Sequence, residues 1–436
     1  MKMNKLLISM ALPMMASMLV QALYNIVDSI FVSHYNFNAL TAVSLTFPVQ
    51  SLMIAISTGT GVGINSIVSR RLGEKHFDNA NNTAIHGILL EFLSSLIFVV
   101  VGLLFSEKFF TFFTKDTEVI EFGRQYMSVC CTLSLGIFMQ IAGERLLQST
   151  GKTIYNMITQ GCGALVNIIL DPILIFGLFG MPEMGVTGAA LATVIGQWTA
   201  MILAFVFNFT KNKELSISPK NFHLDKKIIG DIYSIAVPSI IMQSIMSIST
   251  VGMNKIFNND TAVSVFGVYF KLQSFIFMPV FGLTNALIPI AAYNYGAKKI
   301  DRMHQAVHIA LVITTCLMFI GTLLFEFFPS AFLELFKADE NMLKIGIPAL
   351  RIIGISFCFS GVSIICASYF QALGKAVWSM IISLIRQLFI LLPAAFVLML
   401  IGGLDIVWFA LPAAEVSAMI LSSILYKKIS KKVAAA

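Results

Sequence analysis

Residues 148–152, Gln-Ser-Thr-Gly-Lys, return as Gln-Ala-Leu-Gly-Lys at residues 371–375, 223 positions further along the chain. Other short matches keep nearly the same offset from one end of the chain to the other. They pair Ala11-Leu12-Pro13 with Ala236-Val237-Pro238, Gln50-Ser51 with Gln273-Ser274, Gly59 with Gly282, Gly73-Glu74-Lys75 with Gly296-Ala297-Lys298, and Ala200-Met201-Ile202-Leu203 with Ala418-Met419-Ile420-Leu421. One offset kept over the length of the chain indicates an internal duplication.

Composition shows what kind of unit was duplicated. The 436 residues are 57% hydrophobic and only 12% charged, with a mean hydropathy of +0.86, which is too apolar for a soluble domain. About 20 mostly apolar residues span a bilayer as a helix. The sequence therefore predicts an all-α integral membrane protein with twelve transmembrane helices, six in each copy. The expected spans lie near 6–33, 42–69, 83–105, 125–149, 153–180, 185–209, 231–257, 261–293, 305–330, 343–373, 376–401 and 403–426.

Six spans return the chain to its starting side, so the two copies are expected to share one orientation as parallel repeats. We predict an N-terminal lobe over 1–210 with spans one to six, a flexible cytoplasmic linker over 211–228, and a C-terminal lobe over 229–436 with spans seven to twelve. If the N-terminus is cytoplasmic, 20 of the 29 Lys and Arg residues lie on the cytoplasmic side, which favours both termini in the cytoplasm. The net charge of +7 then reflects topology and not nucleic-acid binding, because the basic residues are spread over many short loops.

Two aspartates within the predicted spans are the strongest candidates for function. Tyr24 and Asp28 are four residues apart in span one, and Asn167 and Asp171 are four apart in span five, so each pair shares a helical face. Both aspartates are expected at similar depth in the outer half of the membrane. Pro172 removes the hydrogen bond to the carbonyl of Ile168, which adds a free oxygen nearby. These oxygens suit a hard cation, and two buried carboxyl groups together suit a proton equally well. The alternative is that both aspartates only cap or flank outer helix ends.

The second copy does not repeat these carboxylates. The positions that answer Asp28 and Asp171 hold Met253 or Asn254 and Leu392, whereas the second copy carries Lys255, Lys271 and Arg386 within spans. Cation chemistry is therefore expected in the first copy. Other polar and ionisable residues within the predicted spans have an ordinary interpretation as structural pairs, and a second interpretation as part of a cavity or gate. The candidates for that second role are Gln21, Asn25, Glu144, Gln148, Lys271 and Arg386.

These residues together resemble the multidrug and toxic compound extrusion (MATE) family. The resemblance rests on Ala11-Leu12-Pro13, Leu23-Tyr24-Asn25-Ile26-Val27-Asp28, Arg71-Leu72-Gly73, the run from Gln148 to Lys152 and the run from Asn167 to Pro172. It implies two six-helix lobes that form a V around a central cavity, and export of amphipathic, often cationic drugs in exchange for sodium ions or protons. It also implies that Asp28, Asp171, Asn167 and Tyr24 handle the cation, with Asp28, Asn167 and Asp171 as the metal ligands if the ion is sodium.

From this resemblance we expect a multi-pass protein of the plasma membrane that acts on small-molecule drugs, works as a monomer and needs no cofactor besides its coupling ion. A lipid-linked oligosaccharide flippase of the same wider superfamily is the alternative, but it should hold several cavity arginines for pyrophosphate, and here only Arg145 and Arg386 are candidates. A membrane enzyme would need a nucleophile with a base, or a metal cluster. The sequence holds no HExxH or Gly-x-Ser-x-Gly motif, so we do not expect an enzyme.

Overall fold

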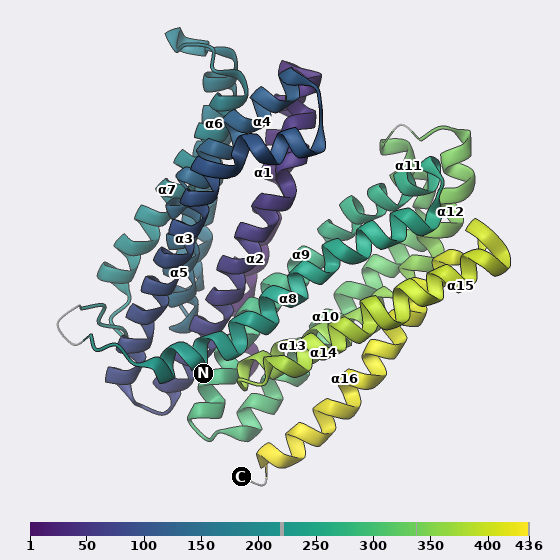
Figure 1. Cartoon of the computed structure of the whole chain (residues 1–436). Coiled ribbons are helices and arrows are strands. Elements are labelled where there is room, and N and C mark those ends of the chain that lie inside the picture. The colour runs from purple at the N-terminus through teal and green to yellow at the C-terminus, as the bar shows by residue number, and fades with distance from the viewer. Residues whose placement is uncertain (219–221, 337, 435–436) are drawn as a thin grey trace. The chain divides into compact units, whose positions relative to one another are not determined.

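The computed structural model describes residues 1–218, 222–336 and 338–434, and every regular element in these ranges is helical (Figure 1). The elements are α1 (Met3–Tyr35), α2 (Phe37–Gly73), α3 (Phe77–Phe113), α4 (Thr117–Thr132), α5 (Leu135–Ser149), α6 (Thr153–Phe176), η1 (Leu178–Gly180), α7 (Gly185–Lys211), α8 (Lys226–Phe257), α9 (Asp260–Gly296), α10 (Ile300–Phe327), α11 (Pro329–Leu335), α12 (Glu340–Gly354), α13 (Phe357–Ala372), α14 (Ala376–Leu384), the π-helix η3 (Ile385–Leu391), α15 (Leu392–Gly402), η4 (Gly403–Asp405), η5 (Val407–Phe409) and α16 (Ala410–Ala434).

The prediction of an all-helical membrane protein is confirmed, with one refinement. Ten spans in the described residues are single helices or continuous helical runs. Spans four and ten are each a broken pair, α4 with α5 bent by 42° and α12 with α13 bent by 47°, and counting each pair as one span gives twelve. The last span also begins later than residue 403, because Gly403 adopts a left-handed φ of +62° and short 3-10 turns precede α16.

The duplication is visible in the backbone at the offset of 223. Asn36 caps α2 and Asn259 caps α9, each through its side-chain oxygen. Asp116 caps α4 and Asp339 caps α12 in the same way. The left-handed residues also recur in pairs, namely Lys75 with Lys298, Gly151 with Gly374, and Gly180 with Gly403. The two copies therefore share their helix starts and their turns, and not only their apolar pattern.

The helices form two compact units that exchange their first helical segments. One unit contains residues 16–236 and is called the 16–236 unit below; the other contains 1–15 with 237–436 and is called the 237–436 unit. The first turns of α1 thus belong to the 237–436 unit, and the first turns of α8 belong to the 16–236 unit. The predicted lobes, 1–210 and 229–436, do not include this exchange of the first helical segments. Pro13 and Pro238 lie within three residues of the two crossover points.

Glycines bring the exchanged segments into close packing within each unit. A Cβ added to Gly63 on α2 would lie 2.5 Å from the carbonyl oxygen of Ile232 on α8. A Cβ added to Gly282 on α9 would lie 2.6 Å from the backbone of Met15 on α1. Since α9 repeats α2, the same glycine-mediated helix contact is made once in each unit.

We expect Gly63→Ala to destabilise the protein, because the added methyl group meets a backbone atom that cannot move aside. Overpacking of this kind costs about 1–3 kcal/mol. Gly161 on α6 is the matched control, since a Cβ there meets nothing within 4 Å; Gly161→Ala should leave stability unchanged or raise it by up to about 1 kcal/mol. Thermal unfolding of the detergent-purified variants measures both. Equal stability of the two variants would contradict this packing argument.

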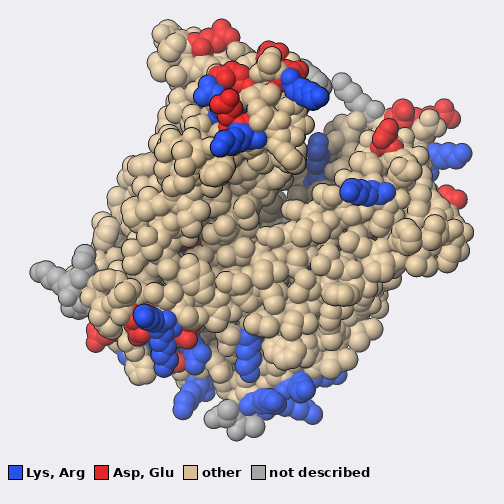
Figure 2. Space-filling view, viewed as in Figure 1, with Lys and Arg blue, Asp and Glu red and all other residues tan. Residues whose placement is uncertain are grey.

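The exposed surface is apolar where lipid would cover it. Ile97, Leu103 and Leu104 on α3 are each more than 60% exposed, which a protein in water would avoid on one continuous helix face. Figure 2 shows Lys, Arg, Asp and Glu gathered near helix ends, with broad uncharged surface between them on the face in view. This distribution fits a helix bundle whose middle lies in hydrocarbon.

The described parts of the predicted linker are held against the 16–236 unit. The backbone N–H of Asp225 donates to His86 Nε2 at 3.0 Å, and the N–H of Ser216 donates to Asn81 Oδ1 at 2.8 Å. Lys152 also forms an ion pair with Glu214 at 3.2 Å. Residues 219–221 lie outside the described part. The described parts of the linker therefore contact the first turns of α3 and the N-cap of α6, whereas we expected a flexible polar bridge.

Candidate functional site

A stripe of small residues on α7 positions the residues around Asp171. Gly188, Ala192, Gly196 and Ala200 recur every fourth residue and are all buried. A Cβ on Gly188 would lie 2.4 Å from the Leu174 carbonyl oxygen, and one on Gly196 would lie 2.6 Å from that of Gly163. Such stripes let two helix backbones approach closely. The contact fixes α6 against α7 on either side of Asn167 and Asp171.

The two predicted aspartates meet in space. The carboxyl groups of Asp28 on α1 and Asp171 on α6 lie close enough for their charges to interact. Asp171 is fully buried. An ionised carboxylate only accepts hydrogen bonds, so the two groups can bond to each other only when one of them carries a proton. The arrangement suits an acid pair that takes up and releases one proton.

Asn167 completes the group as its position on α6 suggested. Its Nδ2 donates to Asp171 Oδ1 at 3.3 Å and lies 3.5 Å from Thr193 Oγ1 on α7. Three buried oxygens around it have no hydrogen-bond partner among the described residues: Asp28 Oδ1, Asp171 Oδ2 and Asn167 Oδ1. Buried polar atoms are nearly always satisfied. Oxygens left over from three side chains at one place can accept a proton or ligate a small cation.

Tyr24 lies near both carboxyl groups, close enough to interact with their charges. The sequence reasoning missed the rest of this surrounding network. Tyr126 on α4 interacts with Asp28 and Tyr24, and Gln50 on α2 approaches the Tyr126 hydroxyl through Nε2 at 3.4 Å. Gln50 was noted only as part of the repeat, although a polar side chain within a span was a usable signal. The site thus draws side chains from α1, α2, α4, α6 and α7, all within the 16–236 unit.

Glu144 and Gln148, the candidates on α5 for a cavity or gate, are buried in interhelical networks. Glu144 accepts hydrogen bonds from Gln140 at 2.9 Å, Gln160 at 2.8 Å and Thr159 at 3.3 Å. Gln148 accepts from Arg145 Nη1 at 2.8 Å and donates to Asn156 at 3.1 Å. With 3% and 2% of their surfaces exposed, both residues hold helices together in this state. They do not belong to the Asp28–Asp171 group.

Two of the other cavity candidates belong to the 237–436 unit. There Lys271 lies over the Phe336 ring at 5.6 Å, and Arg386 forms an ion pair with Glu415 at 2.9 Å. Gln21 is half-buried on α1, one turn before Asn25. The side chain of Asn25 lies outside the described part of the structure.

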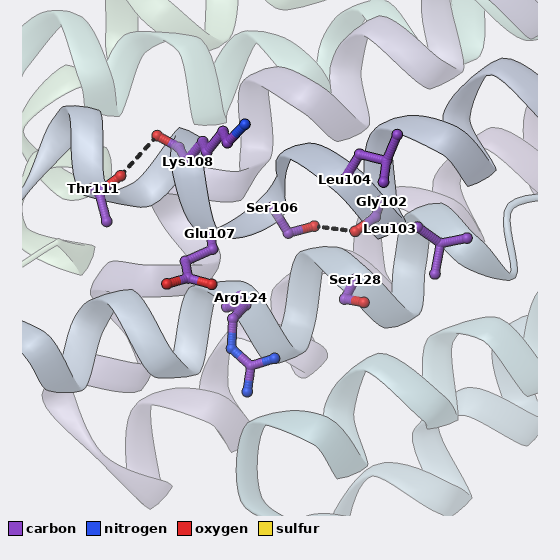
Figure 3. Close-up of a pocket in the computed structure, with 9 residues that line it drawn as sticks. All are labelled: Gly102, Leu103, Leu104, Ser106, Glu107, Lys108, Thr111, Arg124 and Ser128. Atoms are coloured by element: carbon purple, nitrogen blue, oxygen red, sulfur yellow. Dashed lines mark hydrogen bonds between the residues drawn. The ribbon is translucent and has the colours of Figure 1, made fainter.

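A pocket of about 340 Å³ lies between α3 and α4 (Figure 3). Glu107 and Lys108 from α3 and Arg124 from α4 line it together with short polar side chains. Its lining includes none of the predicted site residues, and it opens widely at the surface. It therefore plays no part in the acid pair.

The geometry can be set beside proteins of known family. The family model of MatE matches residues 13–173 and 235–397. A multidrug export protein, MepA, of Staphylococcus haemolyticus is 26% identical over 426 residues, which cover 97% of this chain and 93% of that protein. Among solved structures, a crystal structure of MATE in complex with MaL6 matches with a TM-score of 0.94 at 25% identity, covering 100% of this chain and 98% of the other. An outward-facing multidrug resistance MATE family transporter of the MOP superfamily matches with a TM-score of 0.94 at 25% identity, covering 100% and 97%.

Proposed function

The chain belongs to the MatE family, and from this we propose that it is a multidrug efflux transporter that exports amphipathic, often cationic compounds in exchange for a cation. The export of drugs is supported by the MepA relative, which aligns over nearly its whole length. The cation exchange is supported by one observation above all: two carboxyl groups from different helices lie close together beside three unsatisfied oxygens. The export protein and the transporter structures that this chain resembles support a transporter and not an enzyme.

We propose the proton as the coupling ion. Two carboxylates placed this close repel each other, and one proton removes the repulsion and allows a hydrogen bond between them. Sodium is the alternative, with Asp28, Asn167 and Asp171 as its ligands. The same unsatisfied oxygens could serve it, with both carboxyl groups ionised.

The proposed cycle follows from differential binding. In an outward-open state a proton joins the acid pair and draws α1 toward α6, which weakens drug binding. In an inward-open state the proton leaves to the cytoplasm and the drug binds again. Each ligand shifts the balance of states only by its difference in affinity between them, and reciprocity requires that proton and drug weaken each other's binding equally. Helix α1 is the element that carries this coupling, since it holds Tyr24 and Asp28 and its first residues belong to the other unit.

The flippase alternative is less well supported. Recognition of pyrophosphate would require arginines with free donors facing a cavity. The two candidates from the sequence are both engaged, since Arg145 is buried and bonded to Gln148 and Arg386 is paired with Glu415.

Inverted membrane vesicles provide the test. With the protein in the vesicle membrane, an acidic lumen should drive ethidium into the lumen, and a sodium gradient without a pH gradient should drive none. Vesicles that lack the protein are the control. Ethidium uptake driven by the sodium gradient alone would identify sodium as the coupling ion in place of the proton. Uptake that needs neither gradient would contradict antiport. Placement in the plasma membrane with cytoplasmic termini, and function as a monomer, are parts of the same proposal.

A further inference from the structure

A second group of buried ionisable residues lies in the 16–236 unit, apart from Asp28 and Asp171. Glu91 on α3 is fully buried, and neither of its carboxylate oxygens has a hydrogen-bond partner among the described residues. The Ser57 hydroxyl of α2 lies beside it without forming a well-shaped hydrogen bond. An ionised carboxylate in this position would lose its hydration and gain no donor in return.

The charged and titratable groups that face Glu91 come from α5 and α8. Arg145 on α5 interacts with the charge of Glu91 and also with that of Glu144. Tyr233 on α8 is the other titratable neighbour. Gly61 on α2 makes room for the arginine, because a Cβ there would lie 2.8 Å from Arg145 Cγ. Gly61 thus leaves space for the arginine side chain within the bundle.

The charges of this group do not balance. Glu91 and Glu144 together would carry two negative charges, and Arg145 carries one positive charge. Glu144 is the better-solvated acid, since three neutral donors bond its carboxylate. Arg145 therefore balances Glu144, its sequence neighbour, and one negative charge is left on the acid that has no donors.

We infer that Glu91 is a proton-binding residue, and that Glu91, Glu144 and Arg145 form a second proton site in the 16–236 unit. A proton fits better than a metal ion. A metal would need several oxygen ligands around Glu91, whereas its described neighbours are the Ser57 hydroxyl, the Tyr233 phenol and the Arg145 guanidinium, which repels cations. Protonation neutralises Glu91 without any further ligand. This site is independent of the cation exchange proposed for Asp28 and Asp171.

Infrared spectroscopy of the purified protein tests this site, because a protonated carboxyl group has its own carbonyl absorption. The difference is taken between the spectra of two variants that differ at one carboxyl group. The background is the Asp28→Asn, Asp171→Asn double variant, so that the acid pair contributes nothing to the signal. In this background we expect one buried protonated carboxyl absorption, which Glu91→Gln removes. Glu91→Gln should also fold as stably as its parent, because glutamine resembles a protonated glutamate.

Two further variants separate a proton site from a merely structural role. Glu144→Gln leaves Arg145 free to balance Glu91, so the Glu91 absorption should disappear although Glu91 is still present. Arg145→Gln removes the positive charge, so a second protonated carboxyl absorption should appear. Glu334→Gln, at an exposed position on α11 in the 237–436 unit, is the matched control and should leave the absorption in place. The inference is overturned if Glu91→Gln leaves the absorption unchanged or prevents folding, or if Glu144→Gln leaves the Glu91 absorption intact.

Discussion

Replacing Asp171 with asparagine is expected to reduce proton-driven drug efflux to the level of vesicles without the transporter. Asparagine keeps the size of the side chain and can still bond to Asn167, but it cannot take up a proton. The amide would then be a donor toward Asp28 in every state of the cycle, whatever the pH. Because proton binding no longer changes this contact, the proton can no longer favour one conformational state over the other.

The expected loss can be bounded. Coupling free energies between sites are typically about 1–3 kcal/mol, which corresponds to roughly 5- to 150-fold in affinity. Ethidium binding to purified Asp171→Asn protein should remain, while acidification should no longer weaken that binding by this factor. Asp301→Asn, at the start of α10 and exposed, is the control and should behave as the unmodified protein. If acid still displaced ethidium from Asp171→Asn protein, the acid pair would not be the coupling site.

The helices of this site were predictable from the sequence, and their contacts in part. A separation of four residues predicted that Tyr24 lies beside Asp28 and Asn167 beside Asp171, and the structure brings both pairs together. Their function as a cation site stays a prediction. Thr193 and Tyr126 were missed because a single sequence does not show which face of α7 or α4 turns inward. The small-residue stripe from Gly188 to Ala200 would have identified that face of α7.

The breaks and crossovers of the fold were harder to foresee. Apolar composition is continuous across the junctions of α4 with α5 and of α12 with α13, so hydropathy counts each as one span. The exchange of the first segments of α1 and α8 depends on close backbone contacts at Gly63 and Gly282. Glycines of this kind also occur in loosely packed places such as Gly161, and only the structure separates the two cases.

The buried charges illustrate the same limit. The sequence offered Glu144 and Gln148 as possible cavity or gate residues, with structural pairing as the other interpretation. The structure buries both in side-chain networks, where Arg145, seated beside Gly61, bonds to Gln148. A long side chain can carry its charge well away from its own helical turn. The position of a residue along a span therefore predicts the depth of its backbone in the membrane, but not where a long side chain places its charge.

The second large effect is expected in the 237–436 unit, at the ion pair of Arg386 with Glu415. Arg386 Nη1 donates to both carboxylate oxygens, at 2.9 and 3.2 Å, and the two side chains are 23% and 18% exposed. Arg386 lies in the π-helix η3, whose wider turn precedes Pro393. Glu415→Gln should destabilise the protein by about 3–5 kcal/mol, since breaking one partner of a buried pair leaves the other charge uncompensated. Unfolding of the detergent-purified protein measures the loss.

The double variant Arg386→Met, Glu415→Met shows whether stability requires the ion pair itself, or only that neither charge is left without its partner. Removing both charges also removes the cost of taking them out of water, so replacing a buried pair with apolar residues is often neutral or stabilising by about 1–4 kcal/mol. We therefore expect the double variant to recover most of the stability lost in Glu415→Gln. Arg124→Gln, which breaks an exposed pair with Glu121 on α4, should change stability little. A double variant as unstable as the single one would mean that Tyr269, whose phenol interacts with both charges, or the π-helix itself depends on the ions being present.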